Sequence, residues 1–202
     1  KILALSKDLR ERLELINHTT DSGKFHPLAS ARLQEATTGM RMKTLHAWEA
    51  QTQRMHEANQ ISPKVPTTLQ AQLRDYQLEG FDWMSRLAHW GAGACLADDM
   101  GLGKTLQALA LLLSRASSGP SLVIAPTSVC YNWQQEAAKF APTLNMKLFS
   151  EYAAGEARER MLKTLTRFDC VIISYGLLQR ESDQLNAVHW RTIVADEAQA
   201  LK

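Results

Sequence analysis

The sequence has few of the residues and patterns that mark metal-binding, secreted and membrane proteins. It contains only three cysteines in 202 residues, Cys95, Cys130 and Cys170, and no two of them form a C-x-x-C pair. A zinc site is therefore not expected. Because Cys95 and Cys170 lie in or beside predicted strands, we expect buried free thiols in a reducing cytosol. No apolar run approaches the length of a membrane span, and the N-terminus has no signal-peptide pattern.

The chain also lacks a strong charge of either sign. Lys and Arg number 23 and Asp and Glu number 21, which gives a formal net charge of +2. Any contact with nucleic acid must therefore come from a local patch. The six histidines show no metal-ligand spacing. A hydrophobic content of 45% supports a packed core, and the length fits one large domain or one domain with an appendage. Since the chain does not begin with methionine, we expect a processed or cut fragment.

Residues 1–62 differ in pattern from the rest and predict a helical N-terminal extension. Apolar residues recur at helical spacing over residues 3–16, and Thr20–Gly23 breaks that helix. Residues 28–59 predict one or two further helices, and Ile61–Pro66 reads as an extended linker because two prolines oppose a helix.

Residues 63–202 predict an α/β domain. Leu69–Leu73 and Tyr76–Ala88 read as helical, and strands alternate with helices from residue 94 onward. The predicted strands are Ala94–Ala97, Leu122–Ala125, Met146–Phe149, Cys170–Ser174 and Thr192–Ala195; the predicted helices are Lys104–Ser114, Val129–Phe140, Glu156–Arg167 and Gly176–Gln184. Such alternation predicts a mostly parallel sheet covered by helices on both faces.

The run Asp98–Thr105 reads DDMGLGKT and predicts a loop that holds phosphates. Gly101 and Gly103 let the backbone bend so that its N–H groups approach phosphate oxygens. Lys104 supplies a positive charge to the phosphates, and the hydroxyl of Thr105 suits Mg²⁺. The helix that begins at the loop would add its dipole. The strict G-x-x-x-x-G-K-[ST] pattern is not met, because Asp98 stands at the first glycine position.

Two carboxylates, Asp196 and Glu197, follow the predicted strand Thr192–Ala195, which reads as buried. Open α/β sheets place their ligands at this end of a strand. Asp196 would bind Mg²⁺ directly or through water, and Glu197 would orient or deprotonate the attacking water. The alternative is that the acidic pair simply begins a helix.

Four segments in the expected order resemble the Snf-type group of superfamily II helicase-like ATPases, which includes chromatin remodellers and bacterial relatives. The resemblance is carried by Leu73–Met84, Asp98–Gln107, Leu122–Val129 with Asn132 and Trp133, and Asp196–Lys202. It implies that residues 63–202 form the first RecA-like ATP-binding lobe, incomplete at its C-terminus. One position departs from the family pattern: Gln199 stands where histidine is usual, and glutamine cannot change charge near neutral pH.

The resemblance implies ATP and Mg²⁺ as cofactors and a role for each matching residue. Gln77 would recognise adenine; Met100, Gly101, Leu102, Gly103 and Lys104 would line the phosphates; Thr105 and Asp196 would hold Mg²⁺; Lys104, Asp196 and Glu197 would be catalytic; Pro126, Thr127, Ser128, Ser174 and Tyr175 would lie near the nucleic-acid backbone. Trp133 would serve packing.

The implied function is an ATPase that translocates on double-stranded DNA and displaces a bound protein. Its partners would be duplex DNA, a DNA-bound protein and a second RecA-like lobe, with no membrane. The location would be cytoplasmic, nucleoid-associated in a bacterium or nuclear in a eukaryote. Alone, the fragment would be nearly inactive. The competing readings are another P-loop enzyme, such as a kinase or GTPase, and a nucleotide-free interaction module. N-K-x-D and H-R-D segments are absent, and the intact loop and acidic pair disfavour the module.

Overall fold

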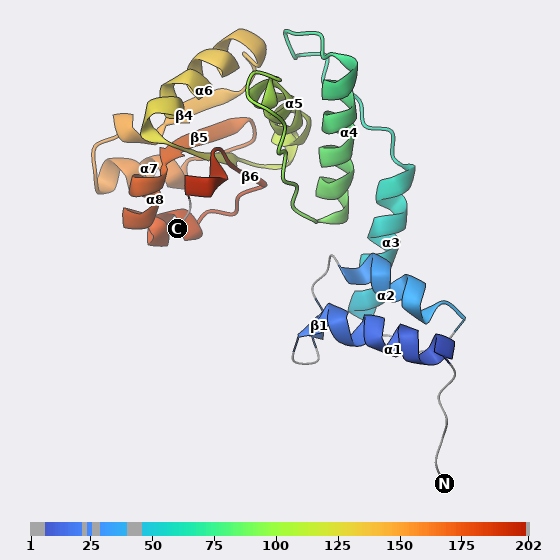
Figure 1. Ribbon diagram of the computed structural model, residues 1–202. Coiled ribbons are helices and arrows are strands. Elements are labelled where there is room, and N and C mark those ends of the chain that lie inside the picture. The colour runs from blue at the N-terminus through green and yellow to red at the C-terminus, as the bar shows by residue number, and fades with distance from the viewer. Residues whose placement is uncertain (1–6, 22–23, 26–28, 40–45, 201–202) are drawn as a thin grey trace. The chain divides into compact units, whose positions relative to one another are not determined.

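The computed structural model describes residues 7–21, 24–25, 29–39 and 46–200, and the chain divides into two compact units (Figure 1). The N-terminal unit comprises residues 1–62 and 84–94, and the α/β unit comprises residues 63–83 and 95–202. Helix α4 (Asp75–Trp90) contributes its first part to the α/β unit and its second part to the N-terminal unit. No helix within the described ranges is both long and apolar enough to cross a membrane.

The described part of the N-terminal unit is mainly helical. Its other elements are α1 (Lys7–Thr19), the short antiparallel pair β1 (Thr20–Asp21) and β2 (Lys24–Phe25), α2 (Ser30–Thr37) and α3 (His46–Gln60). The predicted break begins at Thr20, where α1 ends; Ser22 and Gly23 lie outside the described residues. Leu33, Ala36 and Ala58 are buried, which places the described core of this unit between α2 and α3.

The α/β unit is built on a parallel sheet whose described strands lie in the order β4-β5-β3-β6. The strands are β3 (Ser121–Ala125), β4 (Asn145–Leu148), β5 (Asp169–Ser174) and β6 (Thr192–Ala195). Every residue of β3 and β5 is buried, because both strands lie inside the sheet. Strand β6 was predicted to be buried, but it lies at an edge of the described sheet, and Ile193 is 57% exposed. The lesson is that an apolar, β-branched segment does not reveal its place in the strand order.

Helices cover both faces of the sheet, which confirms the predicted fold class. The remaining elements are α5 (Lys104–Arg115), η2 (Ala116–Ser118), α6 (Thr127–Phe140), η3 (Phe149–Glu151), α7 (Glu156–Lys163), α8 (Tyr175–Arg180), α9 (Ser182–Asn186) and η4 (Ala198–Ala200). Val123 and Ile172 pack against α5 and α6, whereas Leu122 and Val171 pack against the opposite group of helices, α7 to α9. Neighbouring residues face opposite sides because side chains alternate along a strand.

Several predicted elements differ from the structure. Residues 94–97 form no strand, and Cys95 is exposed, because this segment pairs with no strand among the described residues. Cys170 is buried as predicted, and burial, with a smaller effect of Asp169, raises the pKa of its thiol to about 12. The helix predicted at Leu69–Leu73 is a turn, since the backbone N–H of Gln70 donates to Phe140 O, 2.7 Å away, and not along a helix.

The helices predicted on the second face are shorter than the sequence suggests. The segment Glu156–Arg167 was predicted as one helix, but α7 ends at Lys163. Beyond it, Phe168 adopts a left-handed φ of 66° and donates its backbone N–H to Ala116 O at 3.0 Å, which turns the chain into β5. The segment Gly176–Gln184 is two short helices, α8 and α9, separated at Glu181.

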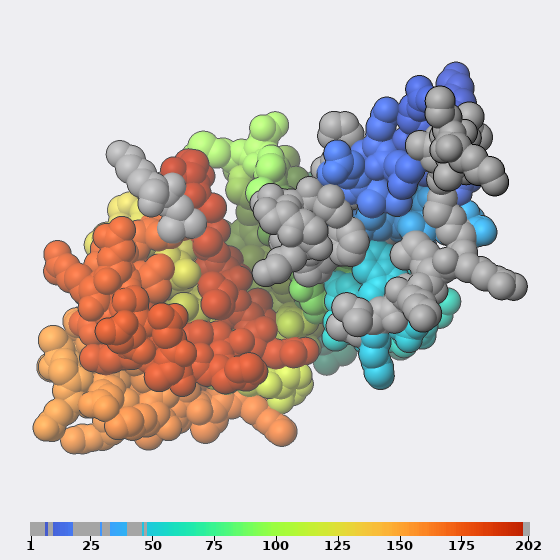
Figure 2. Space-filling model, turned by 90° about the horizontal axis from the view of Figure 1, so that it is seen from below, coloured from blue at the N-terminus to red at the C-terminus, as the bar shows by residue number. Residues whose placement is uncertain are grey.

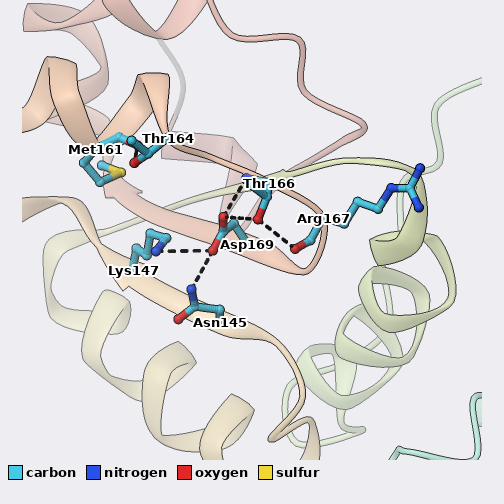
Figure 3. A network of polar contacts seen from close by, with 7 residues as sticks. All are labelled: Asn145, Lys147, Met161, Thr164, Thr166, Arg167 and Asp169. Carbon is cyan, nitrogen blue, oxygen red and sulfur yellow. Dashed lines mark hydrogen bonds and ion pairs between the residues drawn. The ribbon is translucent and has the colours of Figure 1, made fainter.

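A buried carboxylate, Asp169, ties β4 to β5 at the start of both strands (Figure 3). It accepts hydrogen bonds from Asn145 Nδ2 at 2.6 Å, from Thr166 N at 2.6 Å and from Thr166 Oγ1 at 3.1 Å, and it pairs with Lys147 Nζ at 3.2 Å. Burial alone would raise the pKa of Asp169, but these hydrogen bonds lower it below its usual value. The network therefore fixes the β4–β5 register at the amino ends of these two strands.

Candidate functional site

The segment predicted to hold phosphates forms a turn that leads directly into α5. Gly101 and Gly103 have φ values of 85° and 76°, a left-handed conformation in which a side chain is strained. Gly103 immediately precedes α5, and Thr105 lies half-buried in the first turn. Met100 and Leu102 are exposed, Met100 at 91%. The glycine turn and the helix that follows it are as the sequence predicts, although the strand before the turn is not formed.

The ammonium group of Lys104 is turned back onto its own loop. Lys104 Nζ donates to Asp98 O at 2.6 Å and to Asp99 O at 3.0 Å. Two N–H groups of the ammonium are therefore already bonded to carbonyl oxygens, and a phosphate oxygen would have to replace these acceptors. A positive charge is therefore already held within the turn, against two backbone carbonyl oxygens.

The candidate adenine residue, Gln77, lies beside the same turn although it is remote in sequence. Gln77 Nε2 donates to Leu102 O at 3.0 Å, and Gln77 Oε1 accepts from Arg74 N at 3.0 Å. Tyr76 OH also donates to Leu102 O, at 3.3 Å. A Cβ at Gly103 would lie 2.5 Å from Gln77 Nε2, so a side chain there would have to displace the end of Gln77 as well as adopt a strained φ. The beginning of α4 and the turn thus form one site.

A buried glutamine on α5, which the sequence analysis missed, contacts the turn through Asp98. Gln107, on α5, is fully buried, and its Nε2 lies 3.4 Å from Asp98 Oδ2. Its Oε1 is so close to α4 that a Cβ at Gly80 would lie 2.1 Å away. Asp98, which occupies the first glycine position of the strict motif, is therefore directed toward α5. No local pattern in the sequence indicates this contact.

The acidic pair follows β6 in a turn that several elements hold. The backbone N–H of Asp196 donates to Ile124 O at 2.8 Å, Tyr175 OH donates to Asp196 O at 2.7 Å, and Trp133 Nε1 donates to Asp196 Oδ2 at 2.8 Å. Glu197 is exposed and adopts a left-handed φ of 52°. As far as the structure describes the chain, which is to residue 200, the pair does not begin an α-helix and is followed by the 3₁₀ turn η4.

Two ionisable groups beside the acidic turn have shifted pKa values. Burial first, and the nearby carboxylates of Asp196 and Glu197 second, raise the pKa of Tyr175. Burial, followed by the charge of Asp196, also raises the pKa of Glu136, which Lys139 partly offsets. Burial is the larger cause of both shifts, and the carboxylates of the acidic turn add to it.

Gln199, the residue that departs from the family pattern, contacts the second carboxylate. Its Nε2 donates to Glu197 Oε2. Since an amide can donate to a carboxylate without changing its own charge, this contact is insensitive to pH near neutrality. Glu197 is therefore held by a neutral partner.

The candidate nucleic-acid residues lie at the carboxyl ends of β3 and β5, at the same end of the sheet as Asp196. Their hydroxyl groups differ in exposure and in hydrogen bonding. Thr127 and Ser128 are exposed in the first turn of α6, after Pro126. Ser174 caps α8 by accepting from Leu177 N at 3.4 Å, and the hydroxyl of Tyr175 is bonded to Asp196. The hydroxyls of Thr127 and Ser128 are therefore the accessible ones.

The phosphate turn (Asp98–Gly103) and the acidic turn (Asp196–Glu197) lie at the same end of the α/β unit, where the strands have their carboxyl ends. Helix α5 packs against β6, and Arg115 in its last turn donates to Thr192 Oγ1, at the start of β6, at 2.9 Å. The helix therefore runs opposite to the strand, so the beginning of α5 and the end of β6 point the same way. Figure 2 shows β6 and the following turn, in red, at the surface. Within the described residues, no hydrogen bond or ion pair joins Lys104 to Asp196.

Comparisons with known proteins agree with this arrangement. The profile described as the SNF2-related domain matches residues 76–202. YwqA of Bacillus subtilis (strain 168) is 43% identical over 144 residues, which cover 69% of this chain and 15% of that protein. The chromatin-remodeling ATPase INO80 of Cryptococcus neoformans var. neoformans serotype D (strain B-3501A) is 39% identical over 158 residues, covering 71% of this chain and 9% of that protein.

Two solved structures are similar to about as large a share of the chain. The SWI2/SNF2 ATPase core of Sulfolobus solfataricus in complex with dsDNA has a TM-score of 0.58 and 43% identity, covering 69% of this chain and 29% of that one. The ATPase core domain from the same organism has a TM-score of 0.55 and 40% identity. The chain thus spans a small part of its curated relatives. Because the family model matches residues 76–202, which is more than half of the chain, the chain belongs to the SNF2-related domain family.

Proposed function

We propose that the chain is the first RecA-like lobe of a DNA-dependent ATPase that translocates on double-stranded DNA to remodel or displace a bound protein. The observation that carries the proposal is the shared end of the sheet, where the glycine turn before α5 and the acidic turn after β6 both lie. INO80 is named a chromatin-remodeling ATPase, and the Sulfolobus ATPase core was solved with dsDNA, which supports the same assignment.

The residues present fit ATP and Mg²⁺. The ammonium of Lys104 already lies against two backbone carbonyls, and a Cβ at Gly103 would lie 2.5 Å from Gln77 Nε2. Phosphate oxygens offer Lys104 a full negative charge in place of carbonyl dipoles, so binding would draw Nζ out of the turn. Met100, Gly101, Leu102 and Gly103 would line the phosphates, and Gln77 would exchange its contact with Leu102 for the adenine edge.

The catalytic roles follow from the same geometry. Bound Mg²⁺–ATP would supply an electrophilic phosphorus, and the metal would neutralise negative charge on the phosphate oxygens. Thr105 and Asp196 would hold the metal, one from the first turn of α5 and the other from the end of β6. Glu197 would orient the attacking water and accept its proton, after the hydrogen bond from Gln199 to the Glu197 carboxylate is broken. Lys104 would stabilise the negative charge that develops on the transferred phosphoryl group.

The DNA contact is proposed at the ends of β3 and β5. Ala125 and Ser174 are neighbours in the register of these parallel strands, so the segments Pro126–Ser128 and Ser174–Tyr175 begin side by side. The exposed hydroxyls of Thr127 and Ser128, together with the N-terminus of α6, suit phosphate oxygens. Such contacts follow the DNA backbone and read no base sequence. Because Tyr175 also donates to Asp196 O, movement at the DNA contact would reach the metal-binding turn.

The test is ATP hydrolysis by the protein in which this chain is joined to its second lobe, with and without duplex DNA. We expect turnover that duplex DNA stimulates. The 202-residue chain alone should bind ATP weakly and hydrolyse it barely, since an arginine finger from a second lobe contributes about 10³–10⁵ in rate. Turnover that ignores DNA would favour another P-loop enzyme, and no turnover in the two-lobe protein would favour an interaction module. Brisk DNA-stimulated hydrolysis by the chain alone would contradict the proposed need for a second lobe.

A further inference from the structure

Trp133 is a core residue with one polar atom, and that atom points at the acidic turn. The side chain lies on α6, is 2% exposed and packs among buried residues of α5, α6 and the sheet. Its indole is therefore locked in place by surrounding apolar groups. The ring nitrogen Nε1 donates to Asp196 Oδ2 at 2.8 Å, across 63 positions of sequence.

The bond completes the restraint of Asp196. Its backbone N–H is held by Ile124, its carbonyl oxygen by Tyr175, and its other carboxylate oxygen, Oδ1, accepts from Glu197 N at 3.0 Å. With both carboxylate oxygens bonded, rotation of the carboxyl group is blocked. Each oxygen still has a lone pair available, because one hydrogen bond uses only part of its accepting capacity.

We propose that Trp133 is a positioning residue that orients the Asp196 carboxylate for Mg²⁺, an inference that rests on the proposed function. An indole N–H can only donate, so Trp133 cannot itself compete for the metal or for a proton. It also cannot change its own charge. Partners that hold a ligating carboxylate typically contribute 10–100-fold to metal affinity. The structure thus gives the tryptophan a role beyond the packing that its sequence context suggested.

A purely structural explanation makes a different prediction. A buried indole N–H needs a partner, and Asp196 could serve only to satisfy it. In that case removal of the N–H would alter stability and leave metal binding unchanged. If the bond orients the carboxylate, its removal must weaken metal binding even where the fold is retained.

The experiment measures Mg²⁺ binding by the full 202-residue chain in the presence of excess ADP, using Mn²⁺ as a spectroscopic probe in parallel. Trp133 is replaced by phenylalanine and, separately, by 3-benzothienylalanine, which keeps the shape of the indole but has sulfur in place of N–H. We expect both variants to bind the metal about 10–100-fold more weakly. The benzothienyl variant should keep the melting temperature and the metal-free ADP affinity of the parent chain.

The chain offers a matched control in Trp190. This indole donates to a backbone carbonyl oxygen, Leu185 O, at 2.9 Å. It packs on the other face of the sheet. Trp190→Phe should leave the metal affinity unchanged. Unchanged metal affinity in the benzothienyl variant would overturn the role of Trp133. Unchanged metal affinity in Asp196→Ala would instead overturn the proposed function, and with it this inference.

Discussion

The two halves of the candidate site are stabilised in different ways. The acidic turn is held by the sheet and its helices: Ile124, Tyr175 and Trp133 bond Asp196 from three separate elements. The phosphate turn is held partly by itself, through Lys104 Nζ on the carbonyl oxygens of Asp98 and Asp99, and partly by side chains of α4 and α5. One half is therefore formed before any ligand arrives, whereas the other must exchange internal hydrogen bonds for those to a ligand.

This difference assigns separate tasks to the two turns. A pre-oriented carboxylate places a metal without further ordering of the chain, which preserves binding free energy. A loop that binds its own lysine can distinguish a polyphosphate from a weaker anion, because only a ligand that outcompetes two carbonyl contacts releases Nζ. The comparison predicts that substitutions in the phosphate turn change ligand binding, and substitutions near the sheet change stability.

The largest effect is expected at Lys104. Lys104→Ala in the two-lobe protein should reduce ATP turnover by about 100-fold or more, because a charge that stabilises the transferring phosphoryl group is removed. DNA affinity should stay nearly unchanged, since it depends on contacts elsewhere. Steady-state hydrolysis and a DNA-binding titration measure the two quantities. Lys64→Ala, at an exposed position of the linker before α4, is the control. A Lys104→Ala variant with normal turnover would remove this residue from the mechanism.

The next largest effect tests the sheet. Asp169→Asn should lower the free energy of unfolding of the chain by about 3 kcal/mol, because the partners of a buried carboxylate lose their charge-assisted bonds. Since the pKa of Asp169 is lowered in the folded protein, its contribution is complete above the unfolded value, about 3.9, and is lost as pH falls through the folded pKa. Denaturant unfolding at pH 7 and at pH 3 measures this.

The control for Asp169 is Asp183→Asn on α9, at an exposed position. Its unfolding free energy should match that of the parent chain at both pH values. If the difference between parent and Asp169→Asn were the same at pH 3 as at pH 7, the lowered pKa would not be a source of stability.

A smaller effect tests the contact between α4 and the helix behind the phosphate turn. Gly80→Ala should cost about 1–3 kcal/mol, because its Cβ would lie 2.1 Å from the buried Gln107 Oε1. Gly176→Ala, in helix α8 with open space around it, should be neutral or slightly stabilising. Thermal unfolding compares the two. Equal melting temperatures would show that Gln107 moves aside without cost.

The smallest effect separates space from backbone strain in the phosphate turn. Gly101→Ala and Gly103→Ala both place a side chain at positive φ, but only at residue 103 would the Cβ meet Gln77. ADP binding, followed by calorimetry, should be about 1 kcal/mol weaker in Gly103→Ala than in Gly101→Ala. Gln77→Ala should reduce that difference. Equal losses at both glycines would mean that Gln77 does not shape the turn.

Local patterns in the sequence predicted most of the fold and the two turns. Strands β3, β5 and β6 and helices α5 and α6 were found within two residues because their apolar periodicity is strong and their ends carry turn residues. The strand at 94–97 and the burial of β6 were wrong, since both depend on which strands are neighbours. That order is a property of tertiary pairing and leaves no local mark.

The contacts across the site were also beyond the sequence. Nothing near Trp133 indicates that its N–H meets Asp196, and nothing near Gln107 indicates that it lies under Asp98 and against Gly80. Trp133 and Gln107 are buried side chains, and the sequence does not show which residue the polar atom of a buried side chain will contact. The family resemblance supplied roles for individual motifs, whereas the structure supplied the bonds between them.

A structure of the chain with Mg²⁺ and a non-hydrolysable ATP analogue tests the central claim most directly. The account predicts that Lys104 Nζ leaves Asp98 O and Asp99 O for the phosphates, and that Asp196 keeps its bond to Trp133 while facing the magnesium on the same nucleotide. A nucleotide bound with Lys104 still on its own carbonyls, or with Asp196 turned toward a separate region from the metal, would contradict it.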